Sequence, residues 1–142
     1  SEGLIQKGLL ALALLAVVAF LPRLIGRLRR GPMMGVVQLK EKIDQQQDVL
    51  VLDVRTAEDY IGEQGHIANS KNIPVEELGN RLDEIADYVE RPIAIVCRTD
   101  RRSAKAAHLL TRKGFADVHV VKGGMTDWNQ EGYIVMQESG GQ

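Results

Sequence analysis

The sequence predicts an α/β fold in which helices flank a parallel β-sheet, with one apolar helix ahead of that unit. Three observations lead to this fold class. Short β-rich runs alternate with segments of helical spacing between residues 36 and 130, as in sheets whose strands are joined by helices. The runs at 49–54 and 93–96 are almost wholly apolar, which is typical of strands covered on both faces. The apolar run at 9–21 has a composition unlike anything that follows it.

Length and charge limit the classes of protein that fit. A chain of 142 residues is long enough for one ordinary domain and a smaller segment. The formal net charge of -1 predicts no bulk attraction to nucleic acid, so no nucleic-acid partner is expected. The single cysteine cannot form an internal disulfide, so an oxidising compartment is not required. We therefore expect a cytoplasmic protein.

The N-terminal segment leaves three alternatives open. Four arginines at positions 23–30 follow the apolar run, whereas a cleaved signal peptide carries its charge before the run. Residues 4–25 can form a short transmembrane helix that holds the following domain in the cytoplasm. The thirteen residues 9–21 fall short of the roughly 20 that span a bilayer, so a helix lying on a membrane or buried by a partner is the second alternative. The third is an extra helix packed on the domain.

The remaining chain divides into a linker, a domain and a tail. We expect residues 1–34 to be the hydrophobic and basic helical segment with its linker, 35–136 the domain, and 137–142 a flexible tail. The linker prediction rests on the breakers at Gly31, Pro32 and Gly35.

The first half of the domain predicts two strands and a helix before a capped turn. Residues 36–37 read as a short strand, 38–46 have helical spacing, and 49–54 form a β-rich run. Thr56 is followed by two acidic residues at 58 and 59, the pattern of a helix N-cap with acidic residues in its first turn.

The second half predicts further alternation. Apolar residues recur at 78, 82, 85, 86 and 89, which predicts one amphipathic helix over 78–89. Residues 93–96 and 118–121 are expected to be strands, and 124–130 a final turn or helix. A helix over 104–113 ends at Gly114, the residue type that most often terminates helices.

Cys97 stands at the point where the strand at 93–96 gives way to this helix. Unpaired amide groups and the positive end of the helix dipole favour an anion there. Arg98, Arg101 and Arg102 add positive charge, so the thiolate, the nucleophilic form of cysteine, is favoured. A free cysteine after a buried strand is often only a small apolar residue, but such a residue gains nothing from a basic loop. The strand end is also where parallel sheets bind ligands.

Four stretches together resemble one family. They are residues 52–55 (LDVR), 65–67 (GHI) followed by 72–74 (NIP), 97–103 (CRTDRRS), and 123–128 (GGMTDW) with 132–133 (GY). With these motifs in this order, the chain from about 35 to 136 resembles a single-domain rhodanese, a sulfurtransferase module. The resemblance implies the rhodanese α/β fold, with Cys97 carrying sulfane sulfur as a persulfide.

The candidate site follows from the loop and the resemblance together. Cys97 is the predicted catalytic residue. The predicted substrate-binding residues are those of the loop after it: Arg98, Thr99, Asp100, Arg101, Arg102 and Ser103. Asp53 and Arg55 are expected to support the site as an ion pair. No cofactor and no metal are expected, since the three histidines lack ligand spacing with Cys97.

One residue of the loop departs from the family pattern. The loop commonly reads Cys-x-x-Gly-x-Arg-Ser, and Asp100 stands where that glycine would be. Aspartate tolerates unusual backbone angles better than most residues. Its charge partly offsets the arginines, so we expect a weakened affinity for anionic donors such as thiosulfate.

The predicted reaction moves sulfur from a donor such as thiosulfate or a persulfide to a thiol or cyanide through the Cys97 persulfide. Two alternatives differ from it. A cysteine phosphatase or arsenate reductase would carry Cys-x5-Arg, whereas Cys97 and Arg102 enclose four residues, a smaller ring suited to one sulfur. A non-catalytic module could instead use the fold to bind a partner or to signal at a membrane. Residues 4–30 are the segment through which the chain can associate with a membrane.

Overall fold

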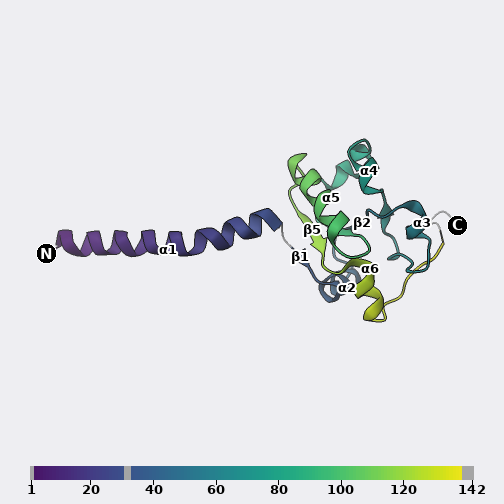
Figure 1. Cartoon of the computed structure of the whole chain (residues 1–142), viewed down its shortest axis with the longest axis horizontal. Helices are drawn as coiled ribbons and strands as arrows, with labels where there is room; N and C mark the ends of the chain where they lie inside the picture. Colours follow the sequence, from purple (N-terminus) through teal and green to yellow (C-terminus); the bar gives the residue numbers. More distant parts are fainter. Residues whose placement is uncertain (1, 31–32, 139–142) are drawn as a thin grey trace. The chain divides into compact units, whose positions relative to one another are not determined.

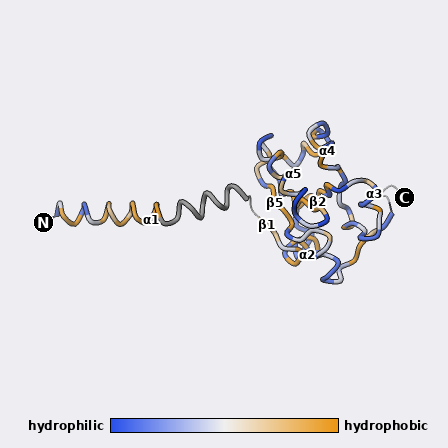
Figure 2. Tube along the Cα trace, in the orientation of Figure 1, coloured by the Kyte–Doolittle hydropathy of each residue, from blue (hydrophilic) through white to orange (hydrophobic). Residues whose placement is uncertain are grey.

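The computed structural model describes residues 2–30 and 33–138, in two compact units, Ser1–Arg30 and Gly31–Gln142. The first unit is one helix, α1 (Glu2–Arg30) (Figure 1). Leucine and valine side chains between residues 9 and 18 are exposed along it, and Figure 2 colours much of that stretch as hydrophobic. None of the helices in the described ranges combines the length and the apolar character needed to cross a bilayer, so the first of the three alternatives for this segment, a transmembrane helix, is not found.

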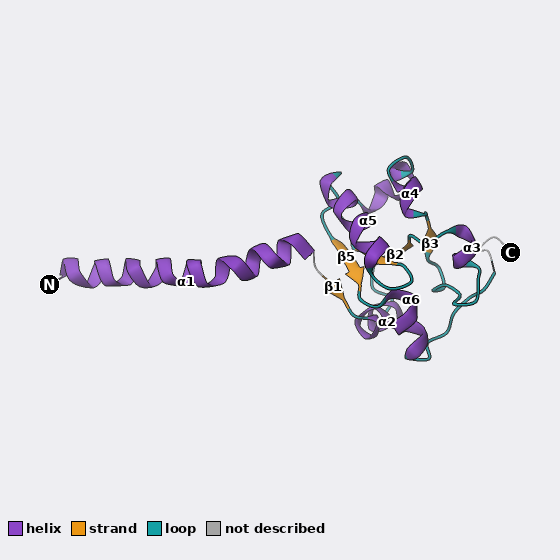
Figure 3. Ribbon diagram, in the orientation of Figure 1, coloured by secondary structure: helices purple, strands orange, loops and turns teal. Residues whose placement is uncertain are grey.

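The second unit contains a five-stranded parallel sheet in the order β1-β5-β4-β2-β3 (Figure 3). The strands are β1 (Met33–Met34), β2 (Leu50–Asp53), β3 (Lys71–Asn72), β4 (Ile93–Val96) and β5 (Val118–Val121). Strand β4 is central, and its last residue, Val96, lies opposite Asp53 of β2. The predicted parallel sheet is therefore confirmed, with the strand that precedes Cys97 at its centre.

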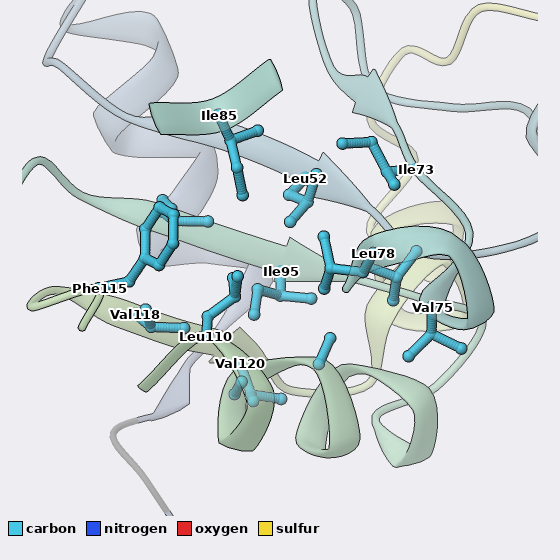
Figure 4. Close-up of a cluster of buried hydrophobic side chains, with 14 of the residues drawn as sticks. Leu52, Ile73, Val75, Leu78, Ile85, Ile95, Leu110, Phe115, Val118 and Val120 are labelled. Atoms are coloured by element: carbon cyan, nitrogen blue, oxygen red, sulfur yellow. The ribbon is translucent and has the colours of Figure 1, made fainter. Parts of the chain in front are cut away.

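The two faces of the sheet are covered by different helices. On one face lie α4 (Val75–Leu78), the 3₁₀ helix η1 (Leu82–Tyr88) and α5 (Arg101–Arg112), and their apolar side chains form the cluster in Figure 4. On the other lie α2 (Val36–Asp44) and α6 (Gly124–Gln130).

Strand β4 supplies side chains to both clusters. Ile93 and Ile95 pack in one, and Ala94 and Val96 in the other. All four are at most 1% exposed. This two-sided burial is the physical reason for the uninterrupted apolar run at 93–96.

Three predicted elements differ from the structure. Residues 33 and 34, predicted as linker, form β1 and pair with β5, a strand too short to show periodicity. The strand predicted at 36–37 is instead the first turn of α2. The single helix predicted over 78–89 is broken after α4 by residues 79–81 and continues as η1, in which Ile85 is buried but non-helical. Glycine and asparagine at 79 and 80 disfavour a continuous helix there.

Two local predictions are confirmed. The hydroxyl of Thr56 accepts a hydrogen bond from the amide of Asp59 at 3.2 Å and caps α3 (Ala57–Tyr60). Gly114, at φ +95, follows the C-cap of α5. Strand β3 was not predicted. Residues 31–32 of the expected linker and 139–142 of the expected tail lie outside the described residues.

Candidate active site

Cys97 follows β4 directly and is 2% exposed. The loop that begins with it is short, since Asp100 is already the N-cap of α5. Within the described residues it is the only free cysteine. The structure therefore places the thiol at the carboxyl edge of the sheet, immediately before the N-terminus of a twelve-residue helix.

The loop is held by the start of α6. The carbonyl of Cys97 accepts a hydrogen bond from the amide of Met125 at 2.8 Å. The carbonyl of Arg98 accepts two, from the amide of Thr126 at 3.0 Å and from its hydroxyl at 3.0 Å. In a trans peptide the N–H points opposite to the C=O. The amides of Arg98 and Thr99 are therefore turned away from α6.

Gly124 makes this close approach possible. Its φ is +51, and a Cβ at this position would overlap the carbonyl oxygens of Cys97 and Thr99. Glycine removes both the overlap and the conformational penalty. The glycine pair at 123–124 thus has a physical role: it lets α6 begin against the cysteine loop.

The amide groups of the loop form a set of free donors. Among the hydrogen bonds of the described ranges, the N–H groups of residues 98–103 have no protein acceptor, and the first that does is Ala104, which donates to Asp100. The first amides of a helix lack intrahelical partners and carry the positive end of its dipole. Together with the turned amides of the loop, they form a site for an anion beside Cys97.

The side chains of the loop divide into exposed and buried. Residues 98–102 are exposed, whereas Ser103 is fully buried. Its hydroxyl is the one buried side-chain polar atom without a hydrogen-bond partner in the described part of the chain. The Nη1 atom of Arg102 lies 3.8 Å from Oδ2 of Asp59, with both side chains about half exposed.

Asp100 lies outside the helical and extended backbone regions, at φ -145 and ψ -3. Its φ is negative, so the loop closes here without the left-handed angles that favour glycine. The conformation is unusual but not left-handed, in line with the tolerance of unusual angles expected of this aspartate.

Asp53 and Arg55 form a buried ion pair at the same edge of the sheet. Nη2 of Arg55 lies 2.7 Å from Oδ2 of Asp53, and both residues are 1% exposed. The same guanidinium donates to the carbonyls of Gly65 at 2.7 Å and Asp59 at 3.2 Å. The pair therefore ties the end of β2 to the segment that follows it. No hydrogen bond among the described residues joins either side chain to Cys97.

Sequence reasoning missed several residues around the loop. Thr126 and Gly124 belong to a stretch recognised only as part of a family motif, although a glycine pair before a helix is a signal of close backbone approach. The sequence identifies Asp59 only as a first-turn residue of a helix.

A surface pocket of about 360 Å³ lies at the ends of β2 and β3, lined by Thr56, Ala57, Glu58, Pro74, Glu76 and Glu77.

Comparison with known proteins agrees with this geometry. Residues 36–131 match the family described as Rhodanese-like domain. The chain is similar to the putative sulfur carrier protein YrkF of Bacillus subtilis, with 36% identity over 68% of this chain and 50% of that protein. It is also similar to the thiosulfate sulfurtransferase GlpE of Pseudoalteromonas translucida, with 32% identity over 66% of this chain and 85% of that protein.

A solved structure gives the same result. The rhodanese-related protein from Thermoplasma volcanium superposes with a TM-score of 0.67 and 33% identity, covering 76% of this chain and 100% of that one. The chain spans only half the length of YrkF. The family match nevertheless covers strands β2 to β5, the Cys97 loop and α6. The chain therefore belongs to the family of rhodanese-like domains.

Proposed function

We propose that this chain is a sulfurtransferase that carries sulfane sulfur on Cys97. The observation that carries the proposal is the set of free amides at residues 98–103, aligned with a helix N-terminus beside the only cysteine. Such a site suits an anionic sulfur bound to Cys97. The names of the Pseudoalteromonas and Bacillus relatives also support it.

The first half-reaction takes sulfur from the donor. With thiosulfate, the Cys97 thiolate attacks the outer sulfur, and a new S–S bond forms to Cys97. The S–S bond of thiosulfate breaks, and its electron pair leaves with sulfite. The amides of residues 98–103 hold the outer sulfur of the persulfide as an anion. Arg98, Arg101 and Arg102 attract the anionic donor, and Asp100 weakens that attraction.

The second half-reaction releases the sulfur. A thiolate or cyanide attacks the outer sulfur of the persulfide and forms a bond to it. The S–S bond to Cys97 breaks and its electron pair returns to the Cys97 thiolate, which restores the starting state. A buried cysteine that is 2% exposed presents only its outer, transferable sulfur to such an acceptor.

Incubation with thiosulfate or with a phosphate ester, followed by intact mass measurement and phosphate assay, tests the proposal. A gain of one sulfur atom on the full chain, removed again by cyanide, supports it. Phosphate release without sulfur loading would instead identify a phosphatase. If neither sulfur loading nor phosphate release is observed, the remaining alternative is a non-catalytic binding module.

The proposal extends to location. We propose that the catalytic unit faces the cytoplasm, where its thiol stays reduced, and that residues 4–30 associate with a membrane without crossing it. The exposed apolar side chains between residues 9 and 18 and the arginines at 23–30 support this second part. The full chain should then sediment with membranes and be released by alkaline carbonate. A full chain that stays in the supernatant at physiological salt would contradict it.

A further inference from the structure

The charges of the catalytic unit are divided unequally between α5 with its preceding loop and everything else. Residues 98–113 contain six basic residues and one acidic residue, whereas the rest of residues 35–142 contain seven basic and seventeen acidic residues. One element is therefore strongly positive on a unit that is otherwise strongly negative. We call its six basic residues the basic face: Arg98, Arg101, Arg102, Lys105, Arg112 and Lys113.

The basic face also differs in how its charges are paired. Of the seven other cations in this unit, five have a carboxylate partner within 4.0 Å among residues 33–138, namely Lys40, Arg55, Lys71, Arg81 and Arg91. On the basic face, within the part of the chain that the structure describes, only Arg102 has one, Asp59 at 3.8 Å. The remaining five cations are thus available to a partner.

Helical geometry aligns these residues along the outer side of α5. Arg101, Lys105 and Arg112 are separated by four and seven residues, a spacing that places side chains on one side of a helix. They are exposed, while Ser103, Ala106 and Leu110 on the opposite side are buried. Figure 2 colours the start of α5 as hydrophilic. The basic face therefore begins at the Cys97 loop and continues for the length of the helix, about 18 Å for twelve residues.

A small donor does not account for this length. An anion such as thiosulfate needs only the loop and the first turn, yet Arg112 and Lys113 lie at the far end of α5. Unpaired like charges gathered on one helix repel one another. The helix dipole favours Arg112 and Lys113 at the C-terminal end of α5 but disfavours the cations of its first turns. Their position favours a ligand that covers the whole helix while it reaches Cys97.

We propose that the basic face docks a protein with an acidic surface around a reactive cysteine, and that this cysteine exchanges sulfur with Cys97. The inference rests on the proposed sulfurtransferase function and adds the class of its partner. In the transfer, the partner's thiolate attacks the outer sulfur of the Cys97 persulfide. The S–S bond to Cys97 breaks, and the Cys97 thiolate leaves with its electron pair.

The partner is a protein rather than a nucleic acid because of the charge around the basic face. Seventeen acidic residues lie elsewhere on the unit, including the glutamates at 58, 76 and 77 that line the pocket next to the site. A long polyanion that extends beyond α5 meets this negative surface and is repelled. A folded protein can confine its negative charge to an area of one helix.

Two synthetic peptides test the docking. Each has one central cysteine, flanked by glutamates in one peptide and by glutamines in the other. We expect the full chain to bind the glutamate peptide about tenfold more tightly by fluorescence anisotropy at low ionic strength. The preference should fade in about 1 M salt, where the Debye length is about 3 Å. Binding does not depend on sulfur loading, so this measurement stands even if the chain fails to accept sulfur.

Matched charge reversals locate the binding. Lys105→Glu should lower the affinity for the glutamate peptide roughly fivefold. Lys42→Glu makes the same change of charge at a cation of α2 for which the described residues likewise show no carboxylate partner, and it should preserve the preference. With the sulfur-loaded chain, the ratio of transfer rates to the two peptides should follow the same pattern.

Three results would overturn the inference: equal binding of both peptides, equal losses in Lys105→Glu and Lys42→Glu, or tighter binding of a single-stranded RNA of the same charge through Lys105. Absence of sulfur loading with a preserved peptide preference would instead refute the proposed function and leave the docking face standing.

Discussion

Gly124 is the residue on which the position of the Cys97 loop depends most directly. Gly124→Ala should displace the carbonyls of Cys97 and Thr99, because its Cβ would overlap both oxygens. We expect a loss of about 1–3 kcal/mol in unfolding free energy and a severe loss of sulfur loading, measured by denaturant unfolding and intact mass.

Gly132→Ala is the matched control for this change. Gly132 also has a positive φ, +76, but a Cβ there meets no atom within 4 Å. The substitution should cost stability through the backbone alone and leave sulfur loading intact. Equal loss of loading in both variants would contradict a specific role for the contact between α6 and the loop.

Asp100 is the second residue whose effect can be isolated. Asp100→Asn removes a negative charge from the loop that begins at Cys97, and Asp100→Gly also adds backbone freedom. Since Asp100 already has a negative φ, we expect the two variants to behave alike. Both should reduce the apparent KM for thiosulfate, because the arginines of the loop then attract the anion without an opposing charge. An unchanged KM in both would show that the carboxylate does not act on the site.

At the scale of elements, the buried Asp53–Arg55 pair connects β2 with the segment before β3. Asp53→Asn leaves a guanidinium that is 1% exposed without its counter-charge. We expect a loss of about 3–5 kcal/mol in unfolding free energy, measured in urea. The double variant Asp53→Asn and Arg55→Met should recover part of it, because no unpaired charge remains buried. A double variant that loses the sum of both single losses would contradict this explanation.

The elements also show what the sequence could predict. The strands at 93–96 and 118–121 and the turn or helix at 124–130 are predicted within a residue or two, because they have apolar β-rich residues or clear boundary residues. Strands β1 and β3 have two residues each, and pairing with a neighbouring strand, which no local pattern records, makes them strands. The break between α4 and η1 falls at Gly79 and Asn80, which disfavour a continuous helix, although the apolar spacing continues across them.

The candidate site likewise combines residues that the sequence predicts with contacts that only the fold creates. Cys97 and its arginines could be found because strand, loop and helix are contiguous in sequence. The contact of Thr126 with Arg98 joins positions 28 residues apart, and the ion pair of Arg102 with Asp59 joins α5 and α3, which only the fold brings together. Such contacts depend on sheet topology, so they could not be predicted from the sequence.

At the scale of the whole molecule, the structure places the first residue of the domain earlier than the sequence predicts. The sequence placed the start of the domain at residue 35, but Met34 is 5% exposed and belongs to the core cluster beside α2 and α6. A protein that begins at Gly31 should fold and accept sulfur like the full chain, since Met34 is the first residue of either core cluster among those that the structure describes. One that begins at Gly35 should lose about 2 kcal/mol through the missing methionine. Equal thermal stability of the two would show that β1 contributes nothing.

The central claim, that Cys97 carries sulfane sulfur, is tested most directly by intact mass spectrometry of the full chain after incubation with thiosulfate. Wild-type protein should gain one sulfur atom and lose it on addition of cyanide, with thiocyanate formed in equal amount. Cys97→Ser should gain none while its circular dichroism spectrum stays that of the wild type. Sulfur loading in Cys97→Ser would contradict the account, because the chain contains no second cysteine to accept it.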